Sequence, residues 1–253
     1  MEIIKTPAFR VISELSGALR GHNPAKGLRI LMYHAVGTQL EFDAKNILSV
    51  SPELFRRQME FLKNSAAFKP VPLGPPKEIY DHTDIAVTFD DGYLDILTQA
   101  APILDKYAIP FTVFVTPELA EKGNPRYLNK TQIAEISKLD GCAIGAHGMT
   151  HCPLAACPQD KLEAELKDSK KWIEDAISKE VAAIAYPYGS VCAKTAREAE
   201  RAGYQLGVCS KTGINAGGAN LLALRRTEIF SRESMRMFYL KLAGFWDWHG
   251  LIR

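Results

Sequence analysis

The chain alternates short apolar runs with longer segments in which apolar residues recur every three or four positions. Short runs bounded by glycine, proline or polar residues are typical of buried strands, and the three-to-four spacing is typical of amphipathic helices. Strands are predicted at residues 27–34, 84–90, 109–116, 142–148, 181–187, 204–210 and 221–230. Helices are predicted at residues 52–64, 93–107, 159–179 and 192–203, with a last helix from about residue 232.

Strands and helices that take turns along the chain predict a parallel sheet or barrel with the helices outside. The sequence shows no internal repeat, no linker and no break in composition, so we predict a single α/β domain over residues 1–253. Residues 69–84 carry four prolines and are predicted to be mostly loop. Pro102 is expected to bend the helix in which it lies.

Composition and charge narrow the class of protein. Hydrophobic residues make up 47% and charged residues 24% of the chain, as in ordinary globular domains. The 31 basic residues nearly balance the 29 acidic ones, so the chain offers no broad positive field and no nucleic-acid partner is expected. No apolar run approaches the roughly 18 residues of a membrane span.

Several features bear on the compartment. The first residues lack the uninterrupted apolar core of a secretory signal, and the five cysteines form no disulfide framework. We therefore predict a cytoplasmic protein with free thiols. The amphipathic segment 9–20 and the aromatic tail 238–253 suggest peripheral contact with a membrane, although packing of the tail on the barrel is the more ordinary interpretation.

Two of the cysteines, Cys152 and Cys157, closely follow His151. This spacing suggests a structural zinc site, but the sequence holds no second ligand pair to support one. Ordinary buried core thiols are therefore the favoured interpretation.

Polar side chains that can carry chemistry stand where predicted strands end. His34 ends the first strand, Asp90 and Asp91 end the second, and His147 ends its own strand. Tyr-Pro-Tyr at 186–188 ends a later strand. Because the carboxyl ends of parallel strands share one rim, where the active sites of such folds are built, we expect these side chains to converge.

The HGMTH segment places His147 and His151 four residues apart. This spacing lets two imidazoles face one point, across a helical turn or a tight loop, and zinc binds such nitrogens at about 2.0–2.1 Å. Gly148 and Pro153 favour a tight turn that leaves a strand. The alternative is a pair of hydrogen-bonded histidines at a helix start, with no metal.

The TFDDG segment, residues 88–92, ends an apolar strand with two adjacent carboxylates. Such carboxylates are costly to bury unless something positive neutralises them. Successive strand residues point to opposite sides, so Asp90 and Asp91 can serve one site only if the backbone turns, which Gly92 permits. We expect one carboxylate on a metal and the other free as a base. The alternative is that either aspartate caps the helix that starts near Tyr93.

One aspartate and two histidines give a divalent ion three protein ligands and leave a position for water. This is the arrangement of catalytic rather than structural zinc sites. Zinc is the expected ion, with cobalt or nickel as alternatives. Such an ion lowers the pKa of bound water toward about 7 and polarises a carbonyl oxygen, so a hydrolytic site is expected.

At this point the chain resembles the polysaccharide deacetylases, the NodB-homology or carbohydrate esterase family 4 group. The resemblance rests on TFDDG at 88–92, HGMTH at 147–151 and AYPYG at 185–189, in the order that the family shows. It implies a distorted (β/α)7 barrel of NodB-homology type. The site residues that it implies are Asp90 as general base, Asp91, His147 and His151 as metal ligands, and the backbone N–H of Tyr188, after Pro187, as the oxyanion donor.

The sequence departs from the family pattern at two motifs. The usual third motif contains an arginine that orients the catalytic aspartate, but Ala185 stands there, and the pair Arg225–Arg226 is the expected substitute. The usual C-terminal Leu-x-His motif, whose histidine is the general acid, has no match after Arg225. The opening ILMYH is similar to the circularly permuted subgroup that acts on poly-β-1,6-N-acetylglucosamine, which implies His34 as the general acid.

The resemblance implies a metal-dependent hydrolase that removes an N-acetyl group from an amino sugar by breaking a linear amide C–N bond. The expected substrates are amino-sugar glycans and, in the cytoplasm, lipid-linked or nucleotide-linked sugars. Because the motif arginine is missing, a non-catalytic barrel that only binds glycans stays an alternative. A glycosidase that uses Asp90 and Asp91 is a further alternative, although retaining glycosidases need carboxyl groups about 5 Å apart that flank one bond, which adjacent residues fit poorly.

Overall fold

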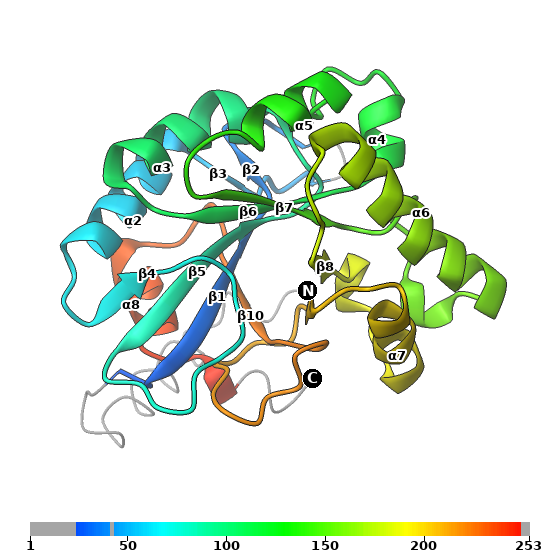
Figure 1. The fold of residues 1–253 in the computed structure, drawn as a ribbon. Helices are drawn as coiled ribbons and strands as arrows, with labels where there is room; N and C mark the ends of the chain where they lie inside the picture. The colour runs from blue at the N-terminus through cyan, green and yellow to red at the C-terminus, as the bar shows by residue number, and fades with distance from the viewer. Residues whose placement is uncertain (1–23, 41–42, 249–253) are drawn as a thin grey trace.

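The computed structural model describes residues 24–40 and 43–248 of the chain (Figure 1). The strands are β1 (Gly27–Tyr33), β2 (Ala35–Val36), β3 (Ser49–Val50), β4 (Phe68–Pro70), β5 (Thr83–Phe89), β6 (Phe111–Val115), β7 (Cys142–Ala146), β8 (Ala183–Ala185), β9 (Leu206–Val208) and β10 (Arg226–Glu228). The helices are α2 (Pro52–Asn64), α3 (Ala101–Tyr107), α4 (Pro117–Glu121), α5 (Lys130–Ile136), α6 (Gln159–Ile177), α7 (Ala193–Arg201) and α8 (Met235–Leu242). A π-helix (Ile96–Ala100) precedes α3, and 3-10 turns occur at Leu154–Ala156 and Pro187–Gly189.

Parallel strands form a nearly closed barrel in the order β10–β1–β5–β6–β7–β8–β9. A parallel bridge between Val208 in β9 and Leu224, just before β10, brings the two ends of this path together. The short strand β4 joins the sheet through the first half of β5, and β2 pairs with β3 in a separate two-stranded sheet. The predicted distorted (β/α)7 barrel is confirmed.

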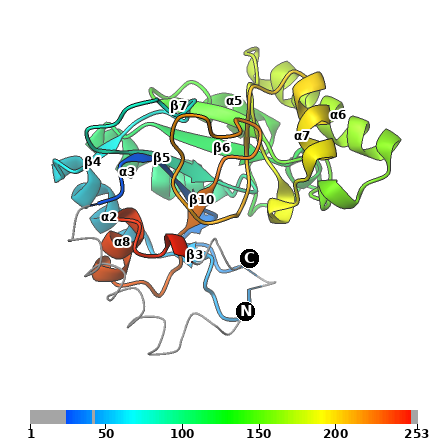
Figure 2. The same cartoon turned by 90° about the horizontal axis from the view of Figure 1, so that it is seen from below.

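Helices cover the outside of this barrel (Figures 1 and 2). Helix α2 packs beside α3 and α8, and α6 packs between α5 and α7. None of the helices within the described ranges is both long and apolar enough to cross a bilayer.

Several local predictions differ from the structure, and two of the differences involve prolines. The loop predicted over 69–84 begins inside β4, a strand that the sequence analysis missed; its Pro70 is tolerated because β4 uses only its one edge that faces β5. The helix predicted over 93–107 is divided, because Pro102 lies in the first turn of α3 and the preceding turn is a π-helix. Proline has no N–H and clashes with the carbonyl four residues earlier, so the regular ladder cannot run through it.

The aromatic tail packs on the barrel over its described part. Phe245 and Trp246 are buried in the main core, so their rings are not free to enter a membrane interface. The remaining parts of the expected membrane contact, residues 9–20 and 249–253, lie outside the described residues.

Alternate residues of the strands face two different cores. The larger core lies between the sheet and its helices, and a smaller one fills the barrel interior. On β1, Leu28 and Ile30 point into the barrel, whereas Leu31 and Tyr33 point to the helices. This period of two places the side chain after β1, His34, on the inward side at the carboxyl end of the barrel.

Arg29 ties β1 to the end of the described chain. Its side chain is fully buried, donates to the Leu242 carbonyl and the Thr227 hydroxyl at 2.9 and 3.0 Å, and forms an ion pair with Asp247 at 2.9 Å. Replacing it in an Arg29→Met variant is expected to lower the free energy of unfolding by about 3 kcal/mol, because the carboxylate and the carbonyl lose their partner. Urea unfolding followed by circular dichroism measures this loss.

The matched control is Arg56→Met, which removes an exposed arginine paired with Glu53 and Glu60 on the surface of α2. Water screens these pairs, so the midpoint of unfolding should move far less than in Arg29→Met. Equal shifts in the two variants would contradict a stabilising role for the buried arginine.

Candidate active site

A cavity of about 280 Å³ opens at the carboxyl ends of the barrel strands. The side chains that were expected to converge at the strand ends do meet in it. It is lined by Met32, His34, Leu48, Asp90, Asp91, His147, His151, Tyr186, Tyr188, Gly189, Ser210, Arg226 and Glu228. Leu48, Ser210 and Glu228 were not among the predicted residues.

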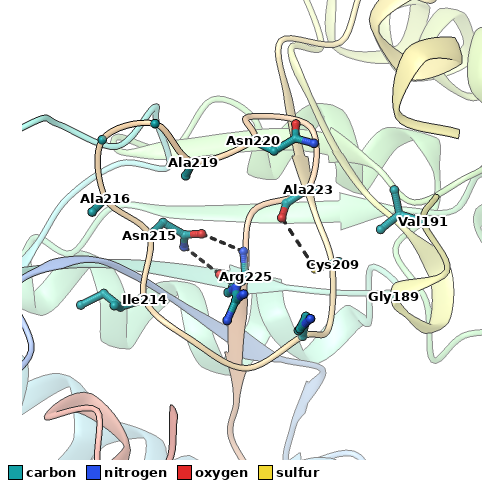
Figure 3. A pocket seen from close by; sticks show the side chains of 13 residues that line it. Gly189, Val191, Cys209, Ile214, Asn215, Ala216, Ala219, Asn220, Ala223 and Arg225 are labelled. Atoms are coloured by element: carbon teal, nitrogen blue, oxygen red, sulfur yellow. Dashed lines mark hydrogen bonds between the residues drawn. The ribbon is translucent and has the colours of Figure 1, made fainter. Parts of the chain in front are cut away.

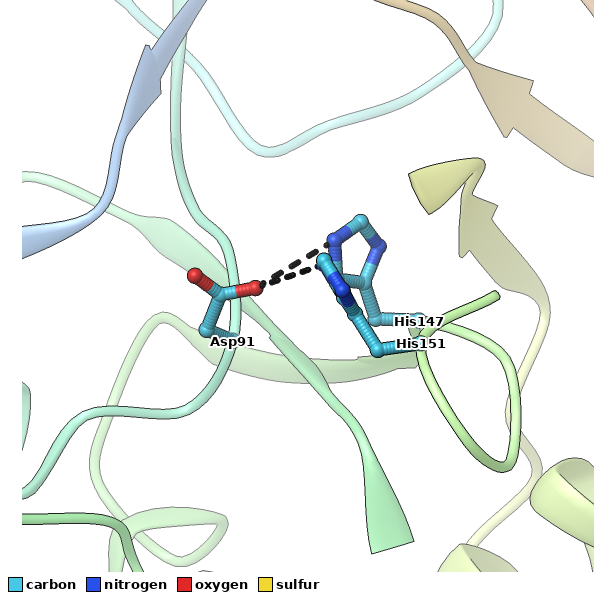
Figure 4. Close-up of side chains that lie close together, drawn as sticks. All are labelled: Asp91, His147 and His151. Atoms are coloured by element: carbon cyan, nitrogen blue, oxygen red, sulfur yellow. Dashed lines mark ion pairs between the residues drawn. The ribbon is translucent and has the colours of Figure 1, made fainter. Parts of the chain in front are cut away.

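Asp91, His147 and His151 form a cluster in this cavity (Figure 4). Asp91 Oδ1 lies 3.2 Å from His151 Nε2 and 3.5 Å from His147 Nε2. One potential ligand atom from each residue lies within 4.8 Å of the others. The cluster brings together the three residues that the sequence predicted as metal ligands.

A backbone turn at the end of β5 lets both aspartates face the cavity. Asp90 continues the inward-facing positions of the strand, and Asp91 would point outward if the strand continued. Instead Asp91 and Gly92 both adopt left-handed backbone angles, with φ of 68° and 73°. The turn was predicted at Gly92 alone, but Asp91 takes part in it, since aspartate tolerates this region better than most residues.

The HGMTH segment is a tight loop and not a helical turn. Gly148 and His151 have positive φ, 70° and 61°. The loop is held from α6 by the buried carboxylate of Glu165, which accepts hydrogen bonds from the Met149 and Thr150 amides at 2.7 and 2.9 Å and from the Thr150 hydroxyl at 2.6 Å. Sequence reasoning missed Glu165, and its only signal was an acidic residue next to the apolar positions of an amphipathic helix.

The protonation of His147 follows from its hydrogen bond. Its Nδ1 lies 2.7 Å from the Ala185 carbonyl oxygen, which can only accept, so Nδ1 carries the proton. Burial lowers the pKa of His147 below its ordinary value, although Asp90 and Asp91 act in the opposite direction. The ring is therefore neutral, and its Nε2 presents a lone pair to the Asp91 carboxylate.

These atoms fit a divalent cation. Asp91 Oδ1 is buried and makes no hydrogen bond of good geometry in the described part of the chain, although His151 Nε2 lies 3.2 Å away, and it faces the bare Nε2 of His147. Burial alone would raise the pKa of Asp91, but His151, His34 and His147 outweigh it, so that the carboxyl stays ionised. Two lone pairs that face each other in a buried place repel unless a cation lies between them. A carboxylate with two imidazoles is a donor set that zinc accepts.

Asp90 is held by Arg226 from β10. The guanidinium donates to both carboxylate oxygens, at 2.6 and 2.7 Å, and both side chains are buried. Burial raises the pKa of Asp90, but the charges of Arg226 and His147 reverse the effect and bring the pKa below its ordinary value. Arg226 therefore holds Asp90 as the motif arginine was expected to, although this chain has Ala185 at the motif position.

Arg225, the other member of the expected substitute pair, does not contact Asp90, and that part of the prediction is wrong. Adjacent strand residues point to opposite sides, so only one of the two arginines can face the site. The Arg225 amide donates to the Asn215 side chain at 2.9 Å. Arg225 lines a second cavity of about 570 Å³ together with Lys211 and the loop 214–220 (Figure 3).

His34 lines the same cavity as the three clustered residues. It is half-buried, and its Nδ1 has no hydrogen-bond partner within residues 24–40 and 43–248. The chain after it is fixed by Asp95, whose carboxylate accepts from the Val36 and Thr38 amides, both at 2.9 Å. The role of His34 as general acid stays a prediction.

The segment after β8 supplies one wall of the cavity. Tyr188 has a positive φ of 59°, and its ring lies 4.8 Å from that of His151 while remaining 70% exposed. Gly189 follows with a φ of 67°, and a Cβ there would lie only 2.0 Å from the Ser210 hydroxyl, so the position requires glycine. Pro187 is buried at the start of this turn. The oxyanion role of the Tyr188 amide stays a prediction.

Glu165 provides a direct test of how the loop supports the cluster. In a Glu165→Gln variant one of the two carboxylate oxygens becomes an NH2 group, which cannot accept a hydrogen bond. Either the Thr150 hydroxyl or the two amides then lose their acceptor, so the loop should hold His147 and His151 less firmly. We expect about 10-fold weaker zinc affinity, the lower end of what loss of an outer-shell partner costs. Competition with a chromogenic chelator measures it.

The control for this variant is Glu163→Gln, on the same helix. Glu163 hydrogen-bonds Gln159 and Lys167 on its own helix and not the loop of the cluster, so zinc affinity should be unchanged. If both variants bind zinc as tightly as the parent protein, Glu165 does not position the ligands.

Comparison with known proteins agrees with this geometry. The family model described as polysaccharide deacetylase matches residues 77–207. The chain is 28% identical over 222 residues to the protein YxkH of Bacillus subtilis (strain 168), covering 85% of this chain and 76% of that protein. It is 34% identical over 122 residues to a peptidoglycan-N-acetylglucosamine deacetylase of Bacillus cereus, covering 48% of this chain and 54% of that protein.

A solved structure shares the fold over nearly the whole described chain. The Streptococcus pyogenes deacetylase PplD in complex with acetate superposes with a TM-score of 0.75 at 28% identity, covering 87% of this chain and 99% of that one. The resemblance to the circularly permuted subgroup stays a prediction. Because the family model spans more than half of the sequence and its motifs form one site, this chain belongs to the polysaccharide deacetylase family.

Proposed function

We propose that this protein is a metal-dependent deacetylase that hydrolyses the N-acetyl group of an amino sugar in a glycan or glycan precursor. The observation that carries the proposal is the buried Asp90, held by Arg226 beside the cluster of Asp91, His147 and His151. Two relatives support it. One is named for N-acetylglucosamine deacetylation in peptidoglycan, and the other, a deacetylase, was solved with acetate.

The residues that line the site divide the steps of this chemistry among them. A divalent ion held by Asp91, His147 and His151 would supply an acidified water and a polarised carbonyl. Asp90 is ionised, and it accepts the proton of the attacking water while Arg226 keeps both its oxygens in place. The Tyr188 amide donates to the developing oxyanion, and His34 donates a proton to the leaving amine.

The geometry supports the two alternative functions less well than deacetylation. A non-catalytic barrel was suggested by the missing arginine, and Arg226 now pairs with Asp90 instead. A glycosidase needs two carboxyl groups on either side of a bond, whereas Asp90 is engaged by Arg226 at both oxygens and Asp91 faces two imidazoles.

We propose zinc as the ion, with cobalt or nickel able to replace it, and amino-sugar glycans or lipid-linked and nucleotide-linked amino sugars as substrates. The protein is proposed to work in the cytoplasm, where such precursors are made. In this proposal the cavity of about 280 Å³ takes one sugar residue with its acetamido group, and the rest of a longer substrate lies outside it.

Acetate release from acetylated chitooligosaccharides tests the proposal. The protein stripped with a chelator should release none, and zinc, cobalt or nickel should restore release. Binding of the oligosaccharide without release under any metal would instead identify a glycan-binding barrel. New reducing ends without acetate would identify a glycosidase.

A further inference from the structure

Cys152 and Cys157 face each other, and Cys152 directly follows His151 of the cluster in the sequence. Their Sγ atoms lie 3.2 Å apart, and both side chains are half-buried. The sulfurs of a disulfide lie about 2.05 Å apart, so these two sulfurs must approach each other by about 1.2 Å for the bond to form. Among the described residues, no other two cysteine sulfurs are in contact.

The short segment between the two thiols is fixed by the fold. Leu154 is fully buried, and the Ala155 amide donates to the Ser190 hydroxyl at 3.2 Å. The amides of Ala156 and Cys157 close a 3-10 turn onto Pro153 and Leu154, at 3.0 and 3.1 Å. The backbone of this turn therefore fixes the positions of the two cysteines relative to each other.

We propose that Cys152 and Cys157 form a disulfide site that staples the loop carrying His151. Glu165 already secures the first half of this loop through Met149 and Thr150. The thiol pair stands at the exit of the loop, on either side of the turn that the Ser190 hydroxyl contacts through the Ala155 amide. Oxidation would make the second anchor covalent while leaving the cluster of Asp91, His147 and His151 in place.

The oxidant would be a small-molecule disulfide such as oxidised glutathione. One cysteine attacks it, forming a mixed disulfide and releasing one glutathione thiol. The second cysteine then displaces the other glutathione and closes the bond. Two protein thiols are oxidised, one glutathione disulfide is reduced to two thiols, and the two protein protons pass to these thiols.

Mass spectrometry and thermal unfolding of the full chain test the proposal. The protein is equilibrated with mixtures of reduced and oxidised glutathione, quenched with acid, alkylated and digested. We expect a Cys152–Cys157 linkage that is lighter than the reduced segment by two hydrogen atoms. The closed ring of six residues should raise the melting temperature by about 5 °C, and a reductant should reverse the rise.

Three variants serve as controls. Cys152→Ser and Cys157→Ser should each abolish the oxidant-dependent rise in melting temperature. Cys192→Ser should keep it, because Cys192 is exposed and its closest partner is the Thr195 hydroxyl at 3.3 Å. In the parent protein the exposed Cys192 should form a mixed disulfide with glutathione. Detection of this adduct shows that the oxidant is active.

Separate glutathione adducts on Cys152 and Cys157, or free thiols there while Cys192 is modified, would overturn the proposal. So would a linkage that forms without raising the melting temperature. None of these measurements uses turnover, so their failure would leave the proposed deacetylase function untouched.

Discussion

An Asp90→Asn variant is expected to lose about 10²–10⁴-fold in kcat for acetate release while still binding zinc. The amide keeps the size of the carboxylate, but it cannot take the proton from the attacking water. Asp91, His147 and His151 are unchanged, so the metal content should match that of the parent protein. Acetate assays paired with metal analysis of the same preparation measure both quantities.

The variant also weakens a buried ion pair, because the amide is uncharged and accepts from Arg226 through one oxygen instead of two. The guanidinium keeps its contacts with the Thr88 hydroxyl, the Cys209 carbonyl and the Phe114 ring. Asp84→Asn is the matched control. Asp84 lies at the opposite end of β5, is also buried, and pairs with Lys77 at 2.6 Å and His82 at 2.8 Å. It should lose stability but not kcat. Full turnover in Asp90→Asn would show that this carboxylate is not the base.

A His147→Ala variant is expected to lose zinc and activity together. Removal of one of three ligands should weaken zinc binding by more than the roughly 10–100-fold that loss of an outer-shell partner costs. The hydrogen bond from the His147 ring to the Ala185 carbonyl is lost as well. Isothermal titration with zinc and acetate release at saturating zinc separate the loss of affinity from any remaining chemistry.

His82→Ala provides the control for this variant, because His82 also lies beside a buried aspartate but belongs to the far end of the barrel. Its zinc affinity and acetate release should equal those of the parent protein. If His147→Ala binds zinc normally, the cation is held by other groups and the assignment of the cluster is wrong.

Much of the site could be predicted because strand ends in a parallel barrel share one rim. That argument placed His34, Asp90 and His147 in one cavity from their positions alone. The choice between Arg225 and Arg226 could not be made in this way. It depends on which residues of β10 face inward, and the predicted strand over 221–230 was much longer than the three residues that pair.

Features that depend on tertiary contacts were beyond the sequence. Glu165 looked like one more charge on a charged helix, and only the docking of α6 against the loop reveals its three hydrogen bonds. β4 was not predicted because Pro70 lies in it, which the structure tolerates since β4 pairs along a single edge. The contact between Cys152 and Cys157 likewise depends on a buried turn between them.

The pairing of Asp90 with Arg226 has a consequence for protein synthesis. The two residues are 136 positions apart, and β1 lies between their strands in the sheet. A nascent chain that has emerged from the ribosome only as far as β9 holds the aspartate without its guanidinium. Truncated translation products are therefore expected to be inert, because the site is completed only when the last strand arrives.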